Sequence, residues 1–223
     1  MCGLCGEITF DGSLADTTAV ARMVESLVPR GPDGQGSWSS GRVAFGHRRL
    51  SVIDLSPCGS QPMVDNELGL TAVFNGCIYD YQELRAELEG HGYRFFSHSD
   101  TEVILKGYHH WGTDVVSHLH GMFAFAIHER DTGRVVLARD RLGIKPLYLA
   151  GTPGRLRFAC PSRIPARFDA FGSVSGTTNQ PATRRSGPFV KPSPAFAGAF
   201  PHGQVGHEVV GGGAVPVPLA GGV

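Results

Sequence analysis

The first residues of the chain offer a nucleophile. The chain begins Met-Cys-Gly-Leu-Cys-Gly over residues 1–6. If Met1 is removed, Cys2 becomes the first residue and carries both a thiol and a free α-amine, which titrate near pH ~8.5 and ~8. One residue would then hold a nucleophile and the base that activates it. The small residues Gly3 and Gly6 would let a substrate approach the backbone closely. Alone, a cysteine at position 2 is usually incidental.

The remaining cysteines do not form a recognisable metal or redox motif. The chain contains five cysteines with irregular spacing: Cys2, Cys5, Cys58, Cys77 and Cys160. Cys2 and Cys5 have the spacing of half a zinc site or of a redox pair, but no second pair and no spaced histidine pair completes it. We therefore expect no metal site, and we interpret every cysteine other than Cys2 as an ordinary reduced thiol.

Three other positions could assist a cysteine that attacks an amide, because such a reaction needs oxyanion donors and partners for the substrate's charges. Asn75 and Gly76 follow an apolar strand and supply a side-chain amide and an unhindered N–H. Arg49 offers a planar fork for a carboxylate, and Asp100 could accept from an ammonium group. Glutamine carries both an α-carboxylate and an α-ammonium group in addition to its side-chain amide. Each position also has a structural interpretation: a hairpin turn, a surface arginine and a helix cap.

The apolar pattern predicts an α+β fold. Helical spacing of apolar residues occurs at 16–27, 80–89 and 102–111. The Gly- and Pro-rich residues 30–34 are typical of a loop. Strands are expected at residues 2–10, 43–50, 70–74, 122–128, 135–139, 146–149 and 156–159. The order is strands, helices and strands again, which favours antiparallel sheets with helices packed on them.

Composition limits the partners of the chain. Its 223 residues carry 20 basic and 20 acidic side chains, so no excess charge points to nucleic acid. No apolar run approaches the ~18 residues of a membrane span. The N-terminus lacks the basic and apolar segments of a signal peptide. We expect a cytoplasmic protein without nucleic-acid or membrane partners.

The composition changes near residue 160. Residues 160–223 contain 9 of the 15 prolines, and Asp169 and Glu208 are their only acidic residues. Apolar periodicity disappears there, and the Gly/Pro-rich end cannot build a packed core. We predict a folded domain over residues 1–159 and a disordered tail over 160–223.

A series of motifs in one order carries a family resemblance. They lie at residues 1–3, 30–34 (Arg-Gly-Pro-Asp-Gly), 47–54 (His-Arg-Arg-Leu-Ser-Val-Ile-Asp), 61–63 (Gln-Pro-Met), 74–76 (Phe-Asn-Gly), 99–102 (Ser-Asp-Thr-Glu), 121–126 (Gly-Met-Phe-Ala-Phe-Ala) and 139–148 (Arg-Asp-Arg-Leu-Gly-Ile-Lys-Pro-Leu-Tyr). This series closely resembles the glutaminase domain of class II glutamine amidotransferases, in particular the asparagine synthetases. The resemblance covers residues 1–159.

The resemblance implies an N-terminal-nucleophile hydrolase fold, in which two stacked antiparallel sheets lie between helical layers. It makes Cys2 the nucleophile and its own α-amine the general base. It also assigns the oxyanion hole to the side chain of Asn75 and the N–H of Gly76. The expected products are ammonia and a γ-glutamyl thioester, which water converts to glutamate.

The resemblance also implies how glutamine is held. Arg49 would bind the α-carboxylate and Asp100 the α-amine, while the backbone at Val52 and Ile53 lines the pocket. Residues 30–34 resemble the loop that closes over bound glutamine. Glutamine is thus the expected substrate, and a homodimer is an open option.

One position in the implied site departs from the family pattern. Asparagine synthetases commonly carry Glu after Asn-Gly, whereas this chain has Cys77. The loss of one charged contact with an ammonium costs on the order of 1–3 kcal/mol, so we expect Cys77 to weaken glutamine binding. The string Asn-Gly-Cys-Ile-Tyr at residues 75–79 is similar to the N-acetylglutaminylglutamine amidotransferase branch.

The family continues into an ATP-dependent synthetase domain with a Ser-Gly-Gly-x-Asp-Ser loop, and no such string occurs in this sequence. The resemblance therefore assigns ATP and Mg²⁺ to a domain that this chain lacks, and no cofactor to the chain itself. Our hypothesis is that the tail is read in a shifted frame or is another truncation product, which translation of the coding DNA in the other two frames would test. The alternative to an active glutaminase is a truncated, non-catalytic fragment that binds glutamine weakly or not at all.

Overall fold

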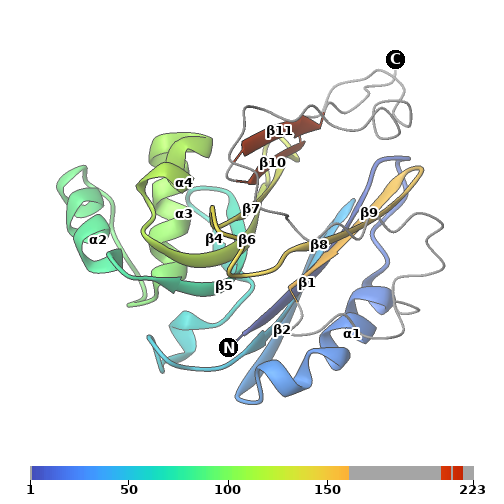
Figure 1. The fold of residues 1–223 in the computed structure, drawn as a ribbon, viewed down its shortest axis with the longest axis horizontal. Coiled ribbons are helices and arrows are strands. Elements are labelled where there is room, and N and C mark those ends of the chain that lie inside the picture. Colours follow the sequence, from blue (N-terminus) through green and yellow to red (C-terminus); the bar gives the residue numbers. More distant parts are fainter. Residues whose placement is uncertain (1, 161–206, 212, 218–223) are drawn as a thin grey trace.

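The computed structural model describes residues 2–160, 207–211 and 213–217. Two β-sheets stack on each other, with helix α1 (Thr17–Ser26) on the outside of one sheet and the remaining helices on the outside of the other (Figure 1). The predicted layer order of helix, sheet, sheet and helix is therefore present. Most of the predicted tail lies outside the described residues.

The first sheet has β1 at its centre. Its strand order is β2-β3-β1-β9-β8, and all of its pairings are antiparallel. Cys5 lies opposite Gly46 of β3 on one side and opposite Ala159 of β9 on the other. The strands are β1 (Gly3–Thr9), β2 (Gly34–Ser40), β3 (Val43–Arg49), β8 (Tyr148–Thr152) and β9 (Arg155–Ala159). The central position of β1 brings its first residues next to β3.

The second sheet is built around the long hairpin of β5 and β6. Its strand order is β11-β10-β7-β6-β5-β4. The strands are β4 (Met63–Asp65), β5 (Leu70–Ile78), β6 (Gly121–Glu129), β7 (Val135–Arg139), β10 (His207–Gly211) and β11 (Gly213–Val217). All pairings are antiparallel except that between β10 and β7, which is parallel. Strands β10 and β11 are regular structure within the region for which the sequence predicts disorder.

The helices cover the outer faces of the sheets. Asp16 caps α1 because its side chain accepts from the N–H of Ala19. On the second sheet lie α2 (Tyr81–Gly90), α3 (Asp100–Trp111) and α4 (Val115–His118). Ser99, rather than Asp100, caps α3: its hydroxyl accepts from the N–H of Thr101 at 3.1 Å. The cap interpretation of Asp100 is therefore wrong, which leaves its carboxylate available for another role.

Apolar side chains fill the space between the four layers. Leu4, Phe45, Val73 and Phe158 belong to the buried cluster between the sheets. A second cluster lies under α1, and a third under α2 and α3. Gly6 belongs to this packing, since a Cβ on it would lie 2.4 Å from the ring of Phe158. Gly6 thus serves packing and not the substrate approach expected from the sequence.

Two local expectations from the sequence are wrong. Strand β5 does not stop at residue 74 but runs to Ile78, so Asn75 and Gly76 lie within a strand and not in a hairpin turn. Gly34 begins strand β2, which the sequence did not reveal. Its residues Gly-Gln-Gly-Ser-Trp-Ser-Ser carry little apolar alternation because β2 is a partly exposed edge strand.

A buried histidine connects the two sheets. His47 of β3 is completely buried, and its Nε2 donates to the carbonyl of Phe74 in β5 at 3.1 Å. Burial lowers the pKa of His47 from 6.5 to about 4. A neutral imidazole is therefore part of the folded state, and protonation opposes folding.

This pKa shift predicts acid sensitivity. Neutral His47 contributes fully to the free energy of unfolding above pH 6.5, where the unfolded histidine is also neutral. This contribution is lost as the pH falls toward 4. The loss reaches about 3 kcal/mol at full protonation. Urea unfolding at pH 7 and pH 4.5 measures it. His47→Gln keeps a donor but cannot titrate, so its unfolding free energy should fall less between the two pH values. An equal fall in both proteins would contradict the assignment.

Candidate active site

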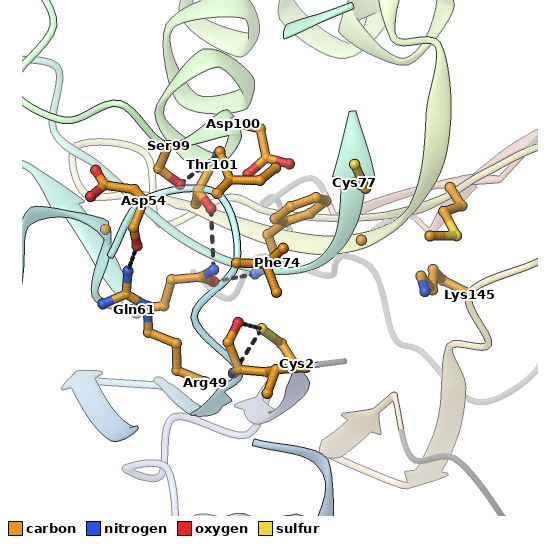
Figure 2. A pocket seen from close by; sticks show the side chains of 16 residues that line it. Cys2, Arg49, Asp54, Gln61, Phe74, Cys77, Ser99, Asp100, Thr101 and Lys145 are labelled. Atoms are coloured by element: carbon orange, nitrogen blue, oxygen red, sulfur yellow. Dashed lines mark hydrogen bonds between the residues drawn. The ribbon is translucent and has the colours of Figure 1, made fainter. Parts of the chain in front are cut away.

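A cavity of about 300 Å³ opens where Cys2, directly before β1, faces the last residues of β5 (Figure 2). The loop between β3 and β4 and the first turn of α3 close its sides. Its lining residues are Cys2, Arg49, Leu50, Val52, Ile53, Asp54, Gly59, Gln61, Phe74, Gly76, Cys77, Ser99, Asp100, Thr101, Met122 and Lys145. Residues from distant parts of the sequence thus meet at one site.

Cys2 is held in place through both its side chain and its carbonyl. Its Sγ lies 3.3 Å from the N–H of Leu50 and 3.5 Å from the Leu50 carbonyl. The guanidinium of Arg30 donates twice to the Cys2 carbonyl, at 3.1 Å each. Burial raises the pKa of the thiol, against the opposing effects of the Leu50 hydrogen bond and nearby Arg49. The folded site therefore favours a neutral thiol that needs a base for activation.

The loop at residues 30–34 is fixed against the end of β3. The N–H of Asp33 donates to the carbonyl of Arg49 at 3.0 Å, and the Asp33 carboxylate accepts from the N–H of Ser51 at 2.8 Å. Gly31 makes this approach possible, because a Cβ there would lie 2.4 Å from the carbonyl carbon of Arg48. The loop that the resemblance relates to substrate closure therefore lies beside Cys2.

Arg49 presents a pre-oriented cation to the cavity. Its guanidinium donates to the carbonyl of Ser56 at 3.0 Å and to the carbonyl of Asp54. Gly59 leaves room for it, since a Cβ there would lie 2.6 Å from Nη2. These two partners are backbone carbonyls that orient the guanidinium, and the nearby Asp54 carboxylate also interacts with its charge.

The loop after β3 supplies the wall predicted at Val52 and Ile53, both of which line the cavity. Its shape depends on Asp54. The Asp54 carboxylate accepts from the N–H of Ser56 at 2.8 Å and from the N–H of His98 at 2.9 Å. This side chain joins the loop to the segment that precedes α3, which positions the cationic and anionic ends of the cavity relative to each other.

Asp100 is the anionic end of the cavity. It is the first residue of α3 and only 4% exposed, and its Oδ2 accepts from the N–H of Ile78 at 3.2 Å. Burial raises the pKa of this carboxyl from 3.8 to about 6, although its hydrogen bonds oppose the rise. A buried carboxylate facing a cavity is well suited to a cationic ligand, which would compensate its lost hydration.

The edge of β5 directs a backbone N–H into the cavity. Strand β4 pairs only with residues 70–72 of β5, so no strand of the described residues lies along the same edge at residues 74–78. The N–H groups of Phe74 and Ile78 point to this edge and bond to Gln61 Oε1 at 2.6 Å and Asp100 Oδ2 at 3.2 Å. Strand alternation gives Gly76, between them, the same direction. Its N–H therefore points toward the cavity that Gly76 lines.

Gly76 also needs to be glycine for packing. A Cβ at this position would lie 2.2 Å from the carbonyl oxygen of Met122 in β6. The neighbouring Asn75 is 1% exposed and is not part of the cavity lining. Its Nδ2 lies 2.9 Å from Sγ of Cys160, just after β9. The two candidate oxyanion donors thus lie in adjacent positions, with Gly76 at the cavity wall and the Asn75 amide behind it.

Cys77 lines the cavity at the position where a glutamate was expected from the family pattern. Its side chain is partly exposed, and burial together with the charge of Asp100 raises the pKa of its thiol. Because the Cys77 thiol is neutral, Asp100 supplies the negative charge on this side of the cavity. The structure therefore brings together Cys2, Arg49, Val52, Ile53, Gly76, Cys77 and Asp100, with Asn75 in contact behind Gly76.

Two further residues of the site were not assigned roles from the sequence. Gln61 donates from Nε2 to Thr101 Oγ1 at 3.1 Å while its Oε1 accepts from Phe74, so it braces β5 against α3. Lys145 is 2% exposed and lines the opposite side of the cavity (Figure 2). Both belong to motifs that carried the resemblance, but only their tertiary contacts reveal what they touch.

Among the described residues, no three His, Cys, Asp or Glu side chains form a group suited to a metal ion.

Comparison with known families identifies this arrangement. The sequence model of the glutamine amidotransferase domain matches residues 1–179. The chain belongs to this family. It is 41% identical over 151 residues to asparagine synthetase [glutamine-hydrolyzing] 3 of Bacillus subtilis, which covers 66% of the chain and 24% of that protein. It is 42% identical over 170 residues to a putative asparagine synthetase of Mycobacterium tuberculosis, covering 69% and 26%. It is 38% identical over 184 residues to amidase chry2 of Gibberella zeae, covering 77% and 27%.

The chain spans about a quarter of the length of these relatives. A solved structure of glutamine phosphoribosylpyrophosphate amidotransferase from Bacillus subtilis superimposes with a TM-score of 0.60 at 22% identity, covering 71% of the chain and 41% of that protein. At this identity the likeness concerns the fold alone, and it confirms the predicted N-terminal-nucleophile hydrolase fold. None of the described helices combines the length and apolar character needed to cross a bilayer.

The Gly31 contact yields a stability prediction. Gly31→Ala should destabilise the domain by about 1–3 kcal/mol, because the added methyl group meets the backbone of Arg48. It should also speed the alkylation of Cys2 by iodoacetamide, since the loop that holds the Cys2 carbonyl is displaced. Gly34→Ala is the matched control, because its Cβ would meet only the Arg49 Cβ at 3.7 Å. Equal unfolding free energies and alkylation rates in the two variants would contradict this account.

Proposed function

We propose that this glutamine amidotransferase domain hydrolyses glutamine through a covalent thioester on Cys2. The observation that supports the proposal is the shared cavity of Cys2, Arg49 and Asp100, because a thiol, a cationic group and an anionic group all line it. An α-amino acid amide has a matching carboxylate, ammonium and reactive amide. The backbone N–H of Gly76, at the wall of the same cavity, supports this assignment.

Binding uses the two charged ends. Arg49 receives the α-carboxylate of glutamine, because its planar fork is already oriented by the carbonyls of Ser56 and Asp54. Asp100 receives the α-ammonium. Cys77 in place of a glutamate removes one anionic contact, so Asp100 carries most of the attraction for that group.

The chemistry requires removal of Met1, since only then does Cys2 have a free α-amine. This amine takes the thiol proton, and the resulting thiolate attacks the side-chain amide carbon of glutamine. The negative charge on the amide oxygen is stabilised by the N–H of Gly76 and by the side-chain amide of Asn75. The protonated amine then gives its proton to the leaving nitrogen, which departs as ammonia. Water attacks the thioester with the amine again acting as base, and glutamate leaves.

The ammonia is expected to serve a synthetase domain of the kind found in the longer relatives. ATP and Mg²⁺ would act in that domain, and no cofactor is needed for the steps assigned to Cys2. The identity of the ammonia acceptor belongs to that second domain. The boundary at residue 159, the cytoplasmic location and the homodimer option stay predictions from the sequence.

The nucleophile can be tested directly. Cys2→Ala should abolish glutamate release from glutamine, because the thioester cannot form. Cys58→Ala removes an exposed cysteine outside the cavity and should retain wild-type activity. Glutamate is quantified by a coupled dehydrogenase assay, and intact-protein mass spectrometry establishes that Met1 has been removed. A folded, Met1-processed wild type that releases no glutamate would overturn the proposal and leave the non-catalytic alternative.

The pKa of Asp100 predicts how activity falls at low pH. The pKa of its carboxyl is about 6, so below this pH the free domain loses the charge that attracts the α-ammonium. kcat/KM for glutamine should therefore fall about tenfold per pH unit below pH 6. Asp100→Asn should lower kcat/KM at pH 7.5 by about 10- to 100-fold, and it should remove this titration. Asp131→Asn changes an exposed carboxylate on the β6–β7 hairpin and should keep the wild-type profile. An unchanged acid limb in Asp100→Asn would exclude this role.

A further inference from the structure

A buried thiol contacts the amide of Asn75. Cys160 is fully buried, and its Sγ lies 2.9 Å from Asn75 Nδ2. Burial raises the pKa of Cys160, with the Asn75 hydrogen bond and the charges of Arg30 and Lys145 opposing the rise. Its sulfur therefore accepts the amide hydrogen as a neutral thiol.

Cys160 is itself fixed to the strand that follows the nucleophile. Its N–H donates to the carbonyl of Leu4 at 2.9 Å, which extends the pairing of β1 and β9 by one residue. Leu4 is two residues from Cys2, and side chains two residues apart on a strand point to the same face. Cys160 thus lies beside β1, on the first sheet, while Asn75 belongs to the second sheet.

Within the described part of the chain, the contact with Cys160 engages one amide hydrogen of Asn75 and leaves the other available. A primary amide carries two N–H donors on one planar group. One of them is directed to Cys160, which fixes the rotation of the amide plane. Asn75 is one residue from Gly76, whose N–H points toward the cavity. An amide with a fixed plane has its second donor in one orientation, which is the condition for effective oxyanion stabilisation.

We propose that Cys160 is a positioning residue, whose sulfur holds the Asn75 amide in the orientation needed to stabilise the oxyanion. The inference rests on the proposed glutaminase activity. It adds that the first sheet supplies both the nucleophile and the group that orients an oxyanion donor of the second sheet. A serine hydroxyl could replace the thiol as acceptor, whereas an alanine methyl group could not.

Steady-state kinetics with glutamine test this role. Cys160→Ala should lower kcat about tenfold and change KM little, because the amide assists the transition state and not substrate binding. Cys160→Ser should recover kcat to within about threefold of wild type, since its hydroxyl accepts the same hydrogen bond. Cys5→Ala is the matched control: it removes a buried thiol from the same strand pair, but on the face toward α1, and should leave kcat unchanged. If Cys160→Ala does not fold, Cys160→Val replaces it, because valine fills the space without offering an acceptor.

A double-mutant cycle separates positioning from general stability. In an Asn75→Ala background, Cys160→Ala should cause no further loss of kcat, because the amide that it orients is absent. An equal loss of kcat in both backgrounds would overturn the proposal, as would a Cys160→Ser variant as impaired as Cys160→Ala. A wild type without glutaminase activity would instead refute the proposed function, and this inference with it. An active wild type without coupling between the two positions refutes the inference alone.

Discussion

The apolar layer between the two sheets is the constraint on which the site depends. Cys2 is supplied by the first sheet, whereas Gly76, Asn75 and Cys77 belong to the second. Neither sheet alone supplies Cys2 together with the candidate oxyanion donors Asn75 and Gly76. Side chains such as Leu4, Val73 and Phe158 hold the sheets face to face, and each loses its contact with water in doing so. The apolar side chains buried between the sheets therefore bring the groups at the cavity together, although they lie away from it.

Polar groups fix the position of one sheet relative to the other. Apolar packing alone tolerates small shifts, while a hydrogen bond between two buried groups has a narrow geometry. His47 donates to the carbonyl of Phe74, and the amide of Asn75 contacts Cys160. Both contacts connect the first sheet to β5 within two residues of Gly76. The part of β5 that would stabilise an oxyanion is thus the part held most directly.

The cavity combines a cationic and an anionic group, each oriented by backbone hydrogen bonds. Backbone carbonyls hold the guanidinium of Arg49, and a backbone N–H holds the carboxylate of Asp100. The raised pKa of Asp100 shows the cost of keeping a carboxylate at a largely dry position. A zwitterionic substrate would compensate both groups at once. This arrangement favours an amino acid amide over an uncharged amide, because an uncharged amide offers neither a carboxylate for Arg49 nor an ammonium group for Asp100.

The sequence by itself determined much of this architecture. Apolar periodicity located α1, α2, α3 and most strands, and the ordered motifs indicated Cys2, Arg49, Gly76 and Asp100 as members of one site. These features could be read because they depend on local spacing and on residue types with specific chemistry. Strand β2 could not be found this way, since an edge strand with Trp38 as its single apolar side chain among glycine, serine and glutamine has almost no apolar alternation.

Only the tertiary structure decided where the polar groups point. It showed that β5 continues through Asn75 and Gly76, because pairing with β6 overrides the turn preference of Asn-Gly. Because β4 is short, it leaves the N–H of Gly76 directed toward the cavity. The Asn75 amide contacts Cys160, which lies 85 residues further along the chain. The tertiary structure also brought Lys145 to the cavity wall. Such facts depend on which strands become neighbours, and that choice is made by the burial of the whole chain and not by any local sequence.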